Sequence, residues 1–133
     1  MISKTIKFKD IEGNEKTIKA YFNLNEGDQA QLSLLKKGGF KAYMEQCLDT
    51  EDGYGVATFL RVMIEKSYGK KVRDPELGVI FMKDEAETAK FMNSEAFSKF
   101  FTDLLQDEKL ATEFINGLPS SVNAIEKDDI SNQ

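Results

Sequence analysis

Side chains that could carry out chemistry are scarce in this sequence of 133 residues, which contains no histidine and one cysteine, Cys47. Without an imidazole the chain cannot form a Ser-His-Asp triad or a Cys-His pair, and it lacks the commonest general acid near neutral pH. Cys47 belongs to an apolar helical pattern that starts at Phe40, so we expect a packed, inert thiol that forms no internal disulfide. We therefore predict that the protein is not an enzyme and has no catalytic residues.

Motifs for binding a cofactor or a metal ion are incomplete. Asp52-Gly-Tyr-Gly55 contains half of a dinucleotide-binding fingerprint, but residue 58 is threonine and no strand is predicted before it. Gly69-Lys70 lacks the upstream glycine of a phosphate-binding loop. None of the adjacent carboxylates has the spacing of a calcium loop, and their ordinary roles are helix capping and solubility; these pairs are Glu51-Asp52, Asp84-Glu85 and Asp128-Asp129. We expect no cofactor and no metal.

Charge and hydropathy limit the kinds of partner. The net charge is −5, and residues 84–118 contain eight acidic but only three basic residues. An acidic carboxy-terminal half argues against binding to a phosphate backbone, so we expect no nucleic-acid partner. The sequence has no apolar run long enough to span a bilayer and no apolar signal core near Met1, so we expect no membrane partner and a cytoplasmic location.

The largest concentration of apolar residues lies between residues 94 and 119. At about 100° per residue, the apolar side chains of 97–105 share an arc of roughly 140°, which predicts an amphipathic helix. Asp107 is placed to cap a second helix, and Asn116-Gly117 followed by Pro119 predicts its end in a left-handed cap. These side chains could form the core, bind a partner, or do both. The candidate partner-binding residues are Phe97, Phe100, Phe101, Leu105, Phe114 and Leu118.

The remaining elements follow from periodicity and turn residues. Alternation predicts a β-hairpin over residues 4–24, with Gly13-Asn14 in its loop. Helical spacing predicts helices over 25–38, 40–48 and 56–68, the last ended by Gly69, and a helix capped by Asp84 that ends at Met92, with Ser94 capping the next. Residues 70–78 are predicted to be irregular, and 79–82 to be a short third strand on the hairpin.

These elements define an α+β fold class that is mostly helical, with an amino-terminal β-hairpin packed against about five helices. We expect a single globular domain over residues 1–119, with the hairpin at 4–24 and the helical part at 25–119. Residues 120–133 have no periodicity and are predicted to form a disordered tail.

Several stretches resemble the tail assembly chaperones of long-tailed phages and prophages of Gram-positive bacteria. They are Thr-Ile-Lys-Phe (5–8) leading to Tyr-Phe-Asn-Leu-Asn (21–25), Ile-Glu-Lys-Ser-Tyr-Gly (64–69), Glu-Ala-Phe-Ser-Lys-Phe-Phe (95–101) and Glu-Phe-Ile-Asn-Gly-Leu-Pro (113–119). The resemblance implies a small, non-catalytic protein of the host cytoplasm, absent from the mature virion. Such a protein binds the tape measure protein, keeps it soluble and helps recruit tail tube protein; self-association is among the contacts we expect.

An alternative of a different class agrees equally well with the size, the acidity and the missing catalytic residues. The chain could be a small acidic adaptor or inhibitor that binds one folded host protein at fixed stoichiometry. Gene context distinguishes the two hypotheses, because a tail chaperone gene should precede an unusually long reading frame.

Overall fold

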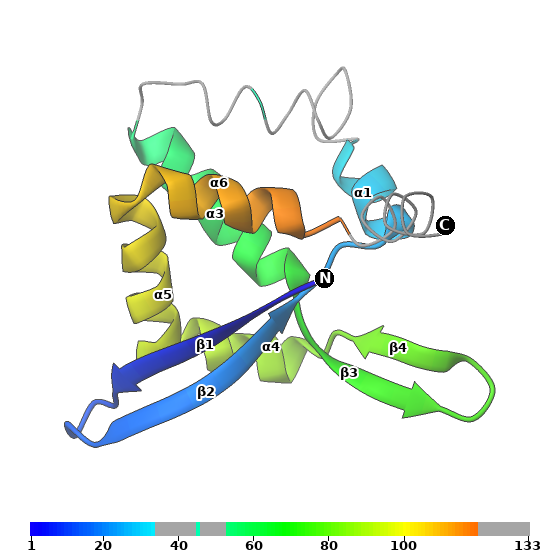
Figure 1. The fold of residues 1–133 in the computed structure, drawn as a ribbon, viewed down its shortest axis with the longest axis horizontal. Helices are drawn as coiled ribbons and strands as arrows, with labels where there is room; N and C mark the ends of the chain where they lie inside the picture. Colours follow the sequence, from blue (N-terminus) through cyan, green and yellow to red (C-terminus); the bar gives the residue numbers. More distant parts are fainter. Residues whose placement is uncertain (34–44, 46–52, 120–133) are drawn as a thin grey trace, which may run out of the picture.

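The computed structural model describes residues 1–33, 45 and 53–119, which form an α+β fold. The helix predicted over 40–48, the end of the one over 25–38 and the tail 120–133 lie outside these residues, apart from the helical Glu45. Four strands form one antiparallel sheet in the order β1-β2-β3-β4 (Figure 1). The elements are β1 Ile2–Lys9, β2 Glu15–Phe22, α1 Glu26–Ser33, α3 Gly53–Ser67, β3 Tyr68–Asp74, β4 Gly78–Met82, α4 Glu85–Met92, α5 Glu95–Gln106 and α6 Glu108–Gly117.

The predicted amino-terminal hairpin is present as β1 and β2, whose register runs from Ile2 opposite Phe22 to Lys9 opposite Glu15. Its loop is closed by Asp10, whose Oδ1 accepts hydrogen bonds from the backbone N–H groups of Glu12 at 3.0 Å and Asn14 at 2.9 Å. Gly13 takes a positive φ of 87°, which glycine adopts without steric cost. One face of the hairpin is buried through Ile6, Ala20 and Phe22.

Phe22 lies at the centre of the aromatic core. Its ring contacts four others, with centroid distances between 5.2 and 6.1 Å, from residues on β3, α4, α5 and α6; they are Tyr68, Phe91, Phe100 and Phe114. Around them lie the fully buried aliphatic and aromatic side chains of Leu24, Phe59, Leu60, Met63, Ile64, Leu104, Ile115 and Leu118. All described elements except β4 therefore contribute to one hydrophobic cluster.

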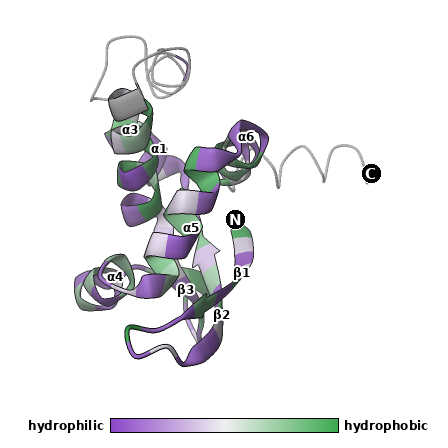
Figure 2. Cartoon of the chain, turned by 90° about the vertical axis from the view of Figure 1, so that its left-hand side faces the viewer, coloured by the Kyte–Doolittle hydropathy of each residue, from purple (hydrophilic) through white to green (hydrophobic). Residues whose placement is uncertain are grey.

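The three helix starts predicted from capping residues are confirmed. The Asp84 side chain accepts from the N–H groups of Ala86 and Glu87, and α4 follows. Ser94 caps α5 by accepting from Phe97, and Asp107 caps α6 by accepting from Leu110. Helices α5 and α6 each carry both hydrophobic and hydrophilic residues (Figure 2). They are therefore amphipathic helices that lie at the surface of the core.

The predicted left-handed cap at Asn116-Gly117 is wrong. Gly117 is the last residue of α6, and among the described residues only Gly13 and Gly78 have positive φ. A Cβ on Gly117 would lie 3.0 Å from Cδ1 of Ile2, so the glycine permits a close approach of α6 to β1. The chain after α6 then meets the segment that follows β2, because the N–H of Leu24 donates to the carbonyl of Leu118 at 2.9 Å and Leu24 forms an isolated parallel bridge with Pro119.

Two predictions for the middle of the chain are wrong. Residues 70–78 are not irregular: β3 occupies Tyr68–Asp74 and pairs with β4 over five residues. Residues 79–82 do lie in a strand, but as the fourth strand of the sheet and not the third, because β3 is the strand next to the hairpin. Helix α3 agrees with the prediction over 56–67, although Gly69 belongs to β3 and does not end the helix.

Candidate interaction surface

The candidate residues on α5 and α6 lie mostly in the core. Phe97 and Phe100 are each 5% exposed, while Phe114 and Leu118 have no exposed surface. Phe101 is half-buried, and its ring stacks on that of Phe97 with 5.2 Å between centroids. Leu105 alone of the six is exposed, at 45%. In this conformation only Leu105 and part of Phe101 can contact a partner, so the partner-binding role of the other four stays a prediction.

The main group of exposed apolar side chains lies on the β3–β4 hairpin, which projects away from α3, α5 and α6 (Figure 1). Among the described residues, seven large hydrophobic side chains are exposed, and four of them belong to this hairpin. These four are Val72 (41% exposed), Leu77 (73%), Val79 (53%) and Met82 (47%). Sequence reasoning missed this surface, although Asp74-Pro75 followed by Gly78 is a turn signal between two short runs.

The register of the hairpin places apolar residues on both of its faces. Opposite residues of an antiparallel pair project to the same face, so Val72 and Ile80 share a face with Met82, while Val79 and Phe81 lie on the other. The first face borders a groove of about 500 Å³ against α4. We call it the α4 groove; it is lined by Tyr68, Gly69, Lys70, Val72, Asp74, Ile80, Met82, Asp84, Glu87 and Thr88. We call its apolar lining residues Val72, Ile80 and Met82 the floor, and its four charged lining residues, Lys70, Asp74, Asp84 and Glu87, the rim.

The carboxylates on the rim are occupied by hydrogen bonds within the protein. Asp74 Oδ1 accepts from the N–H groups of Leu77 and Glu76, both at 2.8 Å, and these bonds lower the pKa of Asp74 below its usual 3.8. Hydrogen bonds from Lys90 and then Lys70 lower the pKa of Glu87, with N···O distances of 3.3 and 3.4 Å. Both groups are held ionised, which suits polar recognition better than proton transfer near neutral pH.

Three contacts attach the hairpin to the body of the protein. Tyr68 stacks on Phe91 of α4 with 4.4 Å between centroids, and burial raises the pKa of its hydroxyl. The second contact is the ion pair between Lys70 of β3 and Glu87 of α4, with 3.4 Å between Nζ and Oε1. Within the hairpin itself, the Phe81 ring covers Gly69, where a Cβ would lie 2.5 Å from Cε2 of Phe81 and 2.6 Å from the carbonyl oxygen of Met82. Only glycine fits there without displacement of the neighbouring strand.

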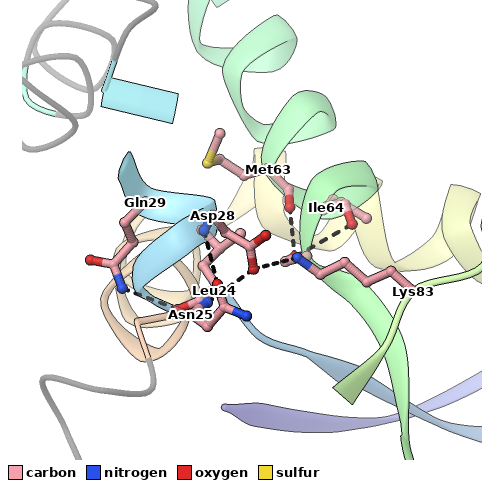
Figure 3. Close-up of polar contacts among 8 residues, drawn as sticks. Leu24, Asn25, Asp28, Gln29, Met63, Ile64 and Lys83 are labelled. Carbon is pink, nitrogen blue, oxygen red and sulfur yellow. Dashed lines mark hydrogen bonds and ion pairs between the residues drawn. The ribbon is translucent and has the colours of Figure 1, made fainter. Parts of the chain in front are cut away.

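The third contact joins the end of β4 to α1. Lys83 Nζ lies 2.6 Å from Oδ2 of Asp28. Figure 3 draws this ion pair between the two side chains. Asp28 also takes part in a reciprocal cap, because its carboxylate accepts from the N–H of Asn25 at 3.0 Å and the Asn25 side chain accepts from the N–H of Asp28 at 2.9 Å. The lysine that follows β4 is therefore directed toward α1.

Nothing in the described residues resembles a metal centre, since no three His, Cys, Asp or Glu side chains converge there. No described helix is both long and apolar enough to cross a membrane. The described surface offers exposed apolar side chains, a strand edge that pairs with no other described strand, and fixed charges around a groove.

A family model described as phage tail assembly chaperone matches residues 1–130 of the chain. Neither the curated proteins nor the solved structures gave a significant match.

Proposed function

Because the chain belongs to the phage tail assembly chaperone family, we propose that it binds the tape measure protein, keeps it soluble and helps recruit tail tube subunits during tail assembly. The phage or prophage is of the long-tailed type, in a Gram-positive host. The protein acts without catalysis in the host cytoplasm and is absent from the mature virion.

The observation that carries this proposal is the group of exposed apolar side chains on the β3–β4 hairpin. Val72 and Met82 are each more than two-fifths exposed, and they lie on the floor of the α4 groove beside the half-buried Ile80. Apolar side chains gathered on a surface with a charged rim are typical of protein interaction sites. Such a surface suits a protein whose role is to hold another polypeptide.

The client segment that suits the groove is an amphipathic helix of the tape measure protein. Its apolar stripe would cover Val72, Ile80 and Met82, and its polar flanks would meet the rim. The rim offers one ammonium, of Lys70, and three carboxylates, of Asp74, Asp84 and Glu87. Basic residues beside the apolar stripe would therefore favour binding, since most of the rim is negative.

Helix α5 supplies a second candidate contact. Of the six candidate partner-binding residues, only Leu105 and the half-buried Phe101 reach the surface. We propose the α4 groove as the main client site because it combines several exposed apolar residues, whereas Leu105 is the one exposed large hydrophobic residue of α5.

Co-expression with the tape measure protein, followed by capture on a tag on the chaperone, tests the site. We expect Met82→Asp and Val72→Asp to lower the captured client by about tenfold or more, as loss of a central apolar contact does. Ile11→Asp is the matched control, because Ile11 is also exposed and apolar but lies in the β1–β2 loop.

Each outcome has a separate meaning. The two groove variants could capture the client normally while a folded Leu105→Asp variant does not. This result would show that the client binds at α5 and not at the α4 groove. A client that stays soluble without the chaperone would contradict the proposed function. Equal capture by the wild type and by the folded Met82→Asp, Val72→Asp and Leu105→Asp variants would contradict both proposed client sites.

A further inference from the structure

Among the described residues, no strand or bridge pairs with the outer edge of strand β4, and the strand carries no charged residue. It is the last strand of the sheet, and its five residues are Gly78, Val79, Ile80, Phe81 and Met82. An open edge presents unpaired N–H and C=O groups to any strand that can approach, and many proteins protect such edges with lysine. No charged side chain opposes an approaching strand here.

The other open edges of the described sheet are protected. Strand β1, at the opposite end of the sheet, has lysine at positions 4, 7 and 9. Strand β3 pairs with β2 through Tyr68 and Gly69 only, and its remaining free part contains Lys70, Lys71 and Arg73. Lys83 directly follows β4, but it is engaged with Asp28. The lack of charge is thus specific to the β4 edge.

We propose that β4 pairs with β4 of a second copy of this chain, antiparallel and about a two-fold axis at Ile80. In this register, each of the five residues of β4 lies opposite a β4 residue of the second copy. Ile80 lies opposite Ile80 of the second copy, Val79 opposite Phe81, and Gly78 opposite Met82. Every cross-strand pair is free of charge, and the Val79–Phe81 pairs have the β-branched and aromatic combination that stabilises sheets.

A second copy suits this edge because the strand is complementary to itself. The nearest like charges on the shared face belong to the inner strands, since Lys71 lies opposite Phe81 and Arg73 opposite Val79. Lys71 of one copy and Arg73 of the other are then three strand spacings apart, about 14 Å. This exceeds the Debye length of about 8 Å at physiological ionic strength, so the repulsion is weak.

Pairing also supports the hairpin and leaves the proposed client site open. The β3–β4 hairpin touches β2 through two residue pairs, and a two-stranded hairpin alone is marginally stable in water. The second copy would complete a four-stranded ribbon. Because the two-fold axis is perpendicular to the sheet, Val72, Ile80 and Met82 of both copies lie on the same face, and the two α4 grooves become neighbours.

Disulfide trapping tests the register directly. In a Cys47→Ser background, Ile80→Cys places the two sulfur atoms across the axis, where opposite Cα atoms of antiparallel strands lie about 4.5–5.5 Å apart, within disulfide reach. We expect mild oxidation to convert this variant to a covalent dimer. Val72→Cys is the control on the inner strand, about 14 Å from its symmetry mate, and it should remain monomeric.

Sedimentation velocity over a range of concentrations gives an independent measurement. We expect the full-length wild type to form dimers, Val79→Lys to raise the dimer dissociation constant by about tenfold or more, and Val72→Lys to behave as the wild type. A wild type that stays monomeric at every concentration, or equal cross-linking of Ile80→Cys and Val72→Cys, would overturn the proposal. Since neither measurement contains the client, failure here is distinguishable from failure of the proposed function.

Discussion

The ring of Phe100 on α5 stacks on the ring of Phe22 on β2, with 5.3 Å between centroids and 16° between planes. Both side chains are buried, and both rings also contact Phe114 of α6 edge to face. Helices α5 and α6 therefore each bury an aromatic residue, Phe100 and Phe114, against the amino-terminal hairpin. The protein presents its exposed apolar surface mainly on a different element, the β3–β4 hairpin.

This arrangement predicts unequal effects of two substitutions on α5. Phe100→Ala should lower the free energy of unfolding by about 3–5 kcal/mol, because it leaves a cavity in the core. Leu105→Ala should change it by less than about 1 kcal/mol, since Leu105 is 45% exposed. Urea denaturation followed by circular dichroism measures both. Equal effects would show that Phe100 is not a core residue.

Gly69 should tolerate no side chain. In Gly69→Ala the added methyl group would lie within 2.6 Å of the Phe81 ring and the Met82 carbonyl oxygen, so β4 must shift away from β3. We expect a loss of about 1–3 kcal/mol of stability. Gly27→Ala is the control, because Gly27 lies in α1 and the new Cβ would be in ordinary contact with Oδ1 of Asn25, at 3.4 Å. Thermal denaturation should show the difference, and equal melting temperatures would contradict the described packing at Gly69.

Asp74 predicts a pH dependence of stability. Its folded-state pKa lies below the usual 3.8 because two backbone N–H groups bond to its carboxylate. The stabilisation is therefore present above the unfolded pKa and is lost as the pH falls through the folded value. Asp74→Ala should destabilise the protein at neutral pH, and its difference from the wild type should shrink below about pH 4. A difference that stays constant on acidification would exclude this role.

The Lys83–Asp28 ion pair predicts a small coupling between β4 and α1. Both side chains are less than one-third exposed, and their charged atoms are 2.6 Å apart. A double-mutant cycle with Lys83→Met and Asp28→Asn should give a coupling free energy of about 0.5–1 kcal/mol that falls as salt is added. Zero coupling at low salt would mean that the pair does not hold β4 to α1.

The elements that could be predicted from sequence are those that have one side facing the core. The first hairpin alternates because its inner face carries Ile6, Ala20 and Phe22, and the helix over 56–67 has a continuous apolar stripe. The caps at Asp84, Ser94 and Asp107 depend on local hydrogen bonds, so the residue type is enough to predict them.

The β3–β4 hairpin was missed because none of its residues belongs to the buried hydrophobic core of the described structure. Lys70, Lys71 and Arg73 interrupt the alternation that a half-buried strand would show, and apolar residues occur on both faces. Gly117 was misread for a related reason. Sequence cannot show that β1 passes close to the end of α6, so a glycine required for contact with Ile2 looked like a helix cap.

The soluble fraction of the tape measure protein tests the central claim most directly. It is measured by centrifugation of lysates in which the tape measure protein is expressed alone, with the wild-type chain, or with a folded Met82→Asp variant. We predict that it aggregates alone, is soluble with the wild type, and aggregates again with the variant. Equal solubility in all three lysates would contradict a chaperone that holds this client on the α4 groove.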